Sequence, residues 1–93
     1  MKKIELNFDK TLIGLSGRQL GVKTFENQVK PVISEETPIE LVFPNQIEAI
    51  ASSFAQGLLA SELEKYGLFE VKKRFRVSSE VKGVEKSFWE SFD

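Results

Sequence analysis

The side chains best placed to do chemistry in this sequence are two adjacent hydroxyls, Ser52 and Ser53, between an apolar segment and a helical pattern. The first turn of a helix exposes unpaired backbone N–H groups and carries the positive end of the helix dipole. A serine there can cap the helix, or it can receive a phosphate whose charge that end tolerates. Ser53 and Gln56 have the spacing of a capping box. Both roles stay open, because one serine can cap while the other is modified.

A second candidate group is Arg18, which follows Gly17 at the start of another predicted helix. A guanidinium near a helix start can hold a phosphate, a carboxylate or an acidic side chain of a partner. Loops that follow parallel strands meet at one edge of the sheet, where ligands commonly bind. We therefore predict a docking or anion-binding surface at this edge, formed by Gly17, Arg18, Asn45, Ser52, Ser53 and Phe54. The simpler alternative is that Arg18 pairs with a local carboxylate or points into water.

The composition argues against catalysis. The 93 residues include no histidine and no cysteine, which removes the commonest general base, thiolate chemistry, disulfides and the usual zinc ligands. No pair of carboxylates is spaced as a general acid and base, so we predict no enzyme, no metal site and no cofactor. The formal charge of −1 gives no general attraction to nucleic acid or to anionic membranes.

Length and hydrophobic content predict one packed domain over residues 1–93. No segment approaches the roughly 20 apolar residues of a membrane span. Lys2 and Lys3 resemble the charged start of a signal peptide, but Glu5 and Asp9 interrupt the apolar run that such a peptide needs. We expect a cytoplasmic protein.

Hydrophobic periodicity predicts the elements that position these groups. Strands are predicted over 3–8, 39–43 and 74–77, and helices over 18–30, over 53–67 and from Ser78 or Ser79 to Phe92. The strand 39–43 is the most continuously apolar, which indicates a central strand buried on both faces. The alternation of strands and helices predicts an α/β fold with a small, three- to four-stranded, largely parallel sheet and helices packed on it.

Within these elements, the first helix is expected to bury a stripe formed by Val22, Phe25, Val29 and Val32. Gly21 suggests a close approach of that helix to the sheet. Two segments stay open: Thr11–Leu15 is a connector or the second arm of a hairpin, and Leu68–Lys73 is a helical turn or part of a strand.

Two further features near the C-terminus have structural and functional alternatives. A basic cluster surrounds Phe75, formed by Lys72, Lys73, Arg74 and Arg76. Such patterns occur on nucleic-acid surfaces, but strand spacing favours a solvated edge that resists unwanted pairing. Trp89 lies slightly off its apolar stripe, so it packs over the sheet edge or anchors a partner or a second copy of the chain.

The segment 47–59, Ile-Glu-Ala-Ile-Ala-Ser-Ser-Phe-Ala-Gln-Gly-Leu-Leu, resembles the strand-to-helix signature of STAS domains, the sulfate-transporter and anti-sigma-factor-antagonist modules. It is most similar to bacterial STAS-like domains of unknown function, which tend to carry Ser-Ser-Phe at this place. Those proteins also have a Gly-Arg helix start after the first strand, and the segment 16–21 occupies that position here. Two residues depart from the antagonist pattern: Ala51 replaces an aspartate and Phe54 replaces a glycine.

The resemblance implies a non-enzymatic regulatory module with a protein partner, such as a kinase-like or anti-sigma-type regulator. In the antagonist family the second serine of the pair is the kinase target, and this serine matches Ser53. The resemblance therefore implies phosphorylation at Ser53, with Ser52 as the neighbouring candidate. An alternative from the residues themselves is a small-ligand, nucleotide or anion site at the same helix starts.

Overall fold

The centre of the fold is a three-stranded parallel sheet in the order β1-β3-β5, seen in a computed structural model that describes residues 2–33 and 38–93. Its strands are β1 (Lys2–Glu5), β3 (Ile39–Val42) and β5 (Phe75–Ser78). The register aligns Ile4, Leu41 and Val77 across the three strands. The middle position of β3 agrees with the prediction from its apolar sequence.

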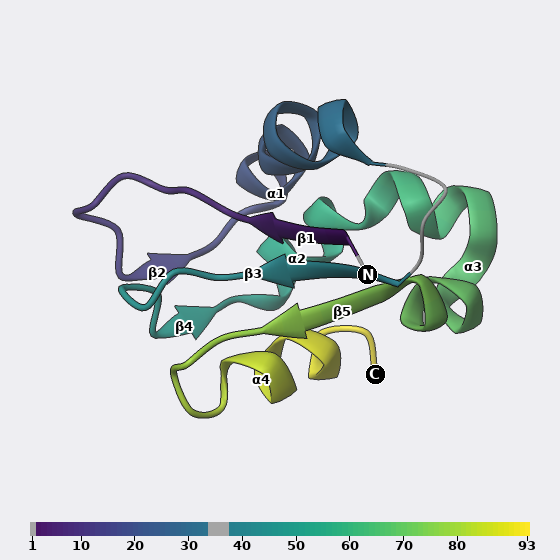
Figure 1. Cartoon of the computed structure of the whole chain (residues 1–93). Helices are drawn as coiled ribbons and strands as arrows, with labels where there is room; N and C mark the ends of the chain where they lie inside the picture. Colours follow the sequence, from purple (N-terminus) through teal and green to yellow (C-terminus); the bar gives the residue numbers. More distant parts are fainter. Residues whose placement is uncertain (1, 34–37) are drawn as a thin grey trace.

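Two very short strands form a second parallel pair, β2 (Gly14–Leu15) with β4 (Ala49–Ile50). Backbone bonds extend the pair on both sides, from Glu48 N to Ile13 O (2.7 Å) and from Ala51 N to Leu15 O (2.8 Å). In Figure 1 the arrows of β2 and β4 point opposite to those of the larger sheet. The segment 11–15 is therefore not the second arm of a hairpin with β1.

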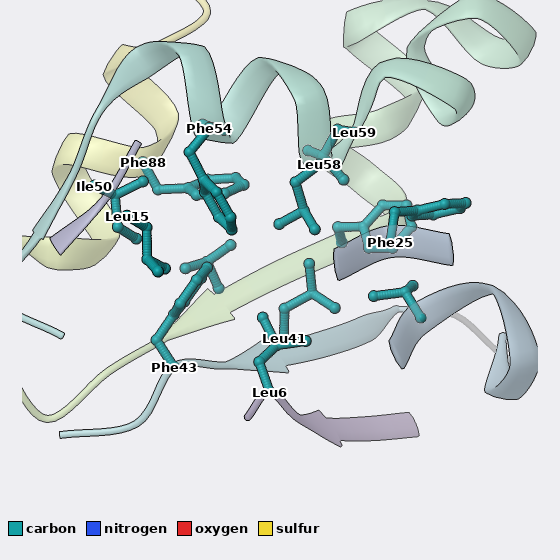
Figure 2. Close-up of a cluster of buried hydrophobic side chains, with 14 of the residues drawn as sticks. Leu6, Leu15, Phe25, Leu41, Phe43, Ile50, Phe54, Leu58, Leu59 and Phe88 are labelled. Carbon is teal, nitrogen blue, oxygen red and sulfur yellow. The ribbon is translucent and has the colours of Figure 1, made fainter. Parts of the chain in front are cut away.

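The helices are α1 (Arg18–Thr24), α2 (Ser52–Leu58), α3 (Ala60–Arg74) and α4 (Val84–Glu90), and α1 continues into a π-helical segment, η1 (Phe25–Val29), and a 3-10 turn, η2 (Lys30–Val32). Figure 2 shows Leu6, Leu41 and Phe43 pointing from the sheet toward α2. The opposite face, which we call the open face, carries no buried side chain among its described residues Lys3, Glu5, Glu40, Val42, Arg76 and Ser78. Burial of β3 on both faces was thus a wrong prediction, because the helices leave the open face uncovered.

The first helix departs from its predicted apolar stripe. Phe25 and Val29 are buried, whereas Val22 and Val32 are exposed. The reason is that the chain leaves the α-helical period at Phe25 and enters η1, where each turn contains more residues than an α-helical turn. The side chains after Thr24 are therefore rotated relative to those before it.

Gly21 allows a close approach to a helix and not to the sheet. A Cβ atom on Gly21 would lie 2.6 Å from Leu58 N and 2.9 Å from Gly57 C. A Cβ atom on Gly57 would lie 3.0 Å from Arg18 Cα. All three distances are too short for a Cβ atom to fit without a shift of the backbone, so this crossing fixes the position of α1 against α2.

In the C-terminal half, the structure decides the conformation of Leu68–Lys73, which the sequence left undecided, and it corrects two predicted boundaries. Leu68–Lys73 is helical, and β5 begins at Phe75, one residue later than predicted. Gly67, where the helix was predicted to end, breaks it with φ 79° and ψ 162°, but the chain resumes helical geometry and continues to Arg74. Ser79 does not cap α4: its Oγ accepts from Val81 N (3.0 Å) in a turn, and Gly83 precedes the helix.

The structure confirms the predicted fold class, a small α/β protein with a three-stranded parallel sheet and packed helices. Within residues 2–33 and 38–93, no helix combines the length and the apolar character needed to cross a bilayer.

Candidate functional site

The two predicted helix starts meet through one side chain. The backbone N–H of Gly17, which precedes α1, donates to Ser53 Oγ in α2 (2.9 Å). Gly17 has φ 95°, a conformation that glycine adopts without strain and that other residues rarely adopt. Gly17, Arg18 and the serine pair therefore lie together as predicted, but the parallel strands that precede them are β2 and β4, and not the two strands of the large sheet on which the prediction was based.

The capping box proposed for Ser53 and Gln56 was wrong. The N-cap lies two residues earlier than the capping box requires: it is Ala51, which makes no side-chain cap bond. Ser53 is the second helical residue, and its hydroxyl reaches the loop before α1 instead of its own helix. Gln56 Nε2 donates to Ser91 O (2.9 Å) and ties α2 to the end of α4.

Both serines of the pair are exposed. Ser53 Oγ accepts the Gly17 bond, and its hydroxyl hydrogen and remaining lone pair face no protein partner among the described residues. The Ser53 hydroxyl therefore lies at the surface of the folded domain. Ser52 is the first residue of α2 and makes no side-chain hydrogen bond within the described part of the chain.

Phe54 does not belong to a docking surface, contrary to the prediction. Its side chain has no exposed area, and its ring packs edge-on against Phe8 (centroids 6.0 Å apart) and Phe43 (6.3 Å). Figure 2 shows Phe54 pointing from α2 into the core, near Phe43 and Phe88. Because this ring anchors the first turn of α2, the neighbouring serines are held outward at a fixed place.

Asn45 lies apart from the serine pair, at the opposite end of β4. Its Nδ2 donates to Glu80 Oε2 (2.6 Å), which joins the loops that follow β3 and β5. The adjacent Gln46 Nε2 donates to Asp9 O (2.7 Å) and so joins the loop after β1. The loops that follow the strands of the large sheet therefore meet at one place, and the starts of α1 and α2 meet at another. The prediction that Asn45 shares one edge with Arg18 and the serines was wrong.

The Asp9 carboxylate organises the loop between β1 and β2, the loop that Gln46 contacts. Asp9 Oδ1 accepts from Thr11 Oγ1 (2.6 Å) and from Thr11 N (2.8 Å). Both bonds favour the charged carboxylate and hold the pKa of Asp9 below its usual value. The bond from the Thr11 hydroxyl lowers this pKa more than the bond from the Thr11 backbone does.

Arg18 begins α1 and is exposed. It lines a cavity of about 240 Å³ between α1 and the start of α3, together with Val22, Phe25, Glu26, Gly57, Ala60, Ser61 and Glu64. No ion pair of Arg18 occurs among the residues that the structure describes. Pairing with a local carboxylate, one form of the simpler alternative, is therefore not seen among the described residues, whereas the exposure of Arg18 agrees with the other form, a side chain that points into water.

Comparison of the chain with family models, with curated protein sequences and with solved structures finds no match. The functional interpretation consequently rests on the residues and their geometry.

The basic cluster does not form a shared strand face. Arg74 lies at the end of α3, where its guanidinium stacks over the Tyr66 ring (4.3 Å) and pairs with the buried Glu62 (Nη2 to Oε1, 3.6 Å). Lys73 is 3.8 Å from Glu70 and lies over the Phe69 ring. Two of the four basic side chains, Lys73 and Arg74, are therefore paired with carboxylates, which lowers the positive charge that this region offers to a nucleic acid.

Trp89 packs beside the edge strand β5, in agreement with the structural alternative that it covers the sheet edge. It is half-buried, and its ring lies edge-on to Phe88 with centroids 5.2 Å apart. Trp89 also lines a cavity with Lys72, Phe75 and Arg76 beside β5.

Sequence analysis missed one contact pair with a clear chemical pattern. The side-chain amide of Gln28 in η1 accepts from Asn7 N and donates to Asn7 O, both at 2.7 Å. An amide that bonds both backbone groups of one residue reproduces what a neighbouring strand would do. The sequence carries no signal for this contact, because the two residues are 21 positions apart and neither belongs to a motif.

Proposed function

We propose that this chain is a STAS-like, non-enzymatic module of the cytoplasm that binds a regulatory protein through the surface around Arg18, Ser52 and Ser53. Phosphorylation of Ser53 controls this binding. The observation that carries the proposal is the bond from Gly17 N to Ser53 Oγ, because it connects an exposed hydroxyl to the residue that positions α1. The resemblance of segments 16–21 and 47–59 to the STAS-like pattern supports the same conclusion.

Phosphate on Ser53 would first change the charge of the surface around Ser53. It adds about −1.5 to −2 charges at neutral pH, beside the Gly17 N–H and the positive end of α2. A basic partner surface is then attracted and an acidic one is repelled. Because Arg18 follows Gly17 directly, the phosphate and the guanidinium would share one surface and change its pattern of charge together.

The helix crossing explains why such a change stays local. Gly21 and Gly57 bring the backbones of α1 and α2 into contact, so α1 cannot slide over α2 without losing this packing. The phosphate therefore changes the loop at Gly17 and the start of α1, while the core below Phe54 stays in place. The partner recognises a surface that changes in charge and in this local structure, on an unchanged core.

The alternative of a nucleotide or anion site at these helix starts has less support. Helices α1 and α2 have seven residues each, and the Gly17 N–H is already bonded to Ser53. Fewer free donors and short dipoles give an anion little to bind.

The test is partner capture from an extract of cells that produce the protein. The unmodified chain, Ser53→Asp and Ser53→Ala serve as baits, and Ser78→Asp is the matched control because Ser78 lies on the open face of the sheet, away from Arg18 and α2. We expect a protein that the unmodified chain and Ser78→Asp retain and Ser53→Asp loses, or the reverse. Equal retention by Ser53→Asp and Ser53→Ala would contradict the phosphate switch.

A further inference from the structure

Within the described part of the chain, the edge of the sheet at β1 has outward backbone groups that no other strand pairs with, and their spacing is definite. Lys2 N donates to Pro38 O (3.3 Å) and Leu6 N donates to Val42 O (2.9 Å), so the even-numbered residues of this strand bond β3. Since the groups of successive strand residues alternate in direction, Lys3 and Glu5 point their N–H and C=O groups away from the sheet. The Glu5 carbonyl accepts one exposed side-chain bond, from Asn7 Nδ2 (3.3 Å), which leaves its second lone pair for a neighbouring strand. The bonds of Asn7 to Gln28 on that outer side agree with this alternation.

Gln28 marks where a free edge ends. Its amide occupies both backbone groups of Asn7, so another strand can pair with Lys3 and Glu5 but not beyond. A cavity of about 350 Å³ lies along this same stretch and is lined by Lys2, Lys3, Ile4, Glu5, Asn7, Gln28 and Val32. Val32 is 44% exposed, which leaves an apolar contact available beside the edge.

We propose that β1 of a second copy of this chain pairs antiparallel with β1 at this edge. The two sheets then join into one continuous sheet about a two-fold axis at Ile4. In this register Lys3 lies opposite Glu5 of the second copy and Glu5 lies opposite its Lys3. Each pair exchanges both of its outward backbone bonds, as hydrogen-bonded antiparallel pairs do.

Charge selects this register. An axis at Lys3 would place two lysines opposite each other, and an axis at Glu5 would place two glutamates opposite each other and require the blocked Asn7. Like charges at directly opposed positions destabilise a strand pair, and opposite charges stabilise it. Only the axis at Ile4 gives two attractive pairs on the open face and uses both residues that Gln28 leaves free.

Sedimentation equilibrium of the full chain over a concentration series tests the proposal. We expect a reversible monomer–dimer equilibrium, and we expect Lys3→Glu and Glu5→Lys each to weaken it roughly tenfold, because each change creates two repulsive pairs by symmetry. An equimolar mixture of these two variants should associate again, since each then meets the opposite charge. This recovery also shows that both variants are folded.

Arg76→Glu is the matched control, because Arg76 lies on the open face at the far edge strand β5 and should not change association. A second arm uses Glu5→Pro, which removes an outward N–H and leaves the β1–β3 bonds, and which should give a monomer. A wild-type chain that stays monomeric at millimolar concentration would overturn the proposal. So would a mixture of Lys3→Glu and Glu5→Lys that fails to associate.

Discussion

Gly21 of α1 and Gly57 of α2 meet at a crossing where neither residue has room for a methyl group. This contact holds the start of α1 beside the start of α2, where Gly17 and Ser53 are hydrogen-bonded. The candidate site therefore depends on two residues that carry no functional group. Their role is to let two backbones approach.

The first prediction concerns this crossing. Gly21→Ala should destabilise the fold by about 1–3 kcal/mol, because overpacking against the α2 backbone outweighs the gain in helix propensity of about 1 kcal/mol. Urea unfolding followed by circular dichroism measures the change. Gly14→Ala is the control, since its Cβ atom would lie at an ordinary 3.7 Å from Ala49 O. Equal stability of the two variants would show that the crossing is looser than described.

The second prediction separates core from surface among the phenylalanines. Phe54→Ala should lower the free energy of unfolding by about 3–5 kcal/mol, because it leaves a cavity between the sheet and α2. Phe69→Ala removes the same atoms from a side chain that is 74% exposed and should change stability little. Thermal or urea unfolding compares the two. A small effect of Phe54→Ala would mean that this ring is not the anchor of the serine pair.

A third prediction concerns the loop at Asp9. Its pKa is lowered by Thr11, so the charged form stabilises the folded state; this contribution is present above the usual Asp pKa and is lost as the pH falls through the lowered value. Thr11→Val removes the hydroxyl donor and should raise the pKa of Asp9 toward its usual value, measured by NMR titration of the carboxyl carbon. Thr11→Ser keeps both donors and should leave the pKa low. Equal pKa values in the two variants would contradict the assigned cause.

The α/β fold class and the central position of β3 were predictable, because strand and helix periodicities differ and β3 is the most apolar strand. The sequence did not indicate which faces are covered. The spacing of the apolar residues in β3 indicates that Ile39 and Leu41 are buried. Whether the open face is covered as well depends on where all the helices pack. The small size of Gly21 indicated a close approach, but a missing side chain does not identify its neighbour.

The candidate site was predictable in part. Gly17, Arg18 and Ser53 lie together as expected, but they do so after the short strands β2 and β4 and not at the edge of the large sheet from which the expectation was derived. A shift of two residues in the N-cap of α2, from Ser53 to Ala51, changed Ser53 from a cap into an acceptor for Gly17, and it turned Phe54 into the core. Helix boundaries from sequence are uncertain by at least this much, so the roles of side chains at a helix start are the first to be misassigned.

The most direct test of the account is NMR of the chain with phosphoserine incorporated at position 53, compared with the unmodified chain and with phosphoserine at position 78 on the open face. The account predicts that phosphate at 53 changes the Gly17 amide resonance and those of the first turn of α1, and leaves the core around Phe54 unchanged. Phosphate at 78 should not affect Gly17. An unchanged Gly17 resonance with phosphate on Ser53 would contradict the claim that this hydroxyl controls the start of α1.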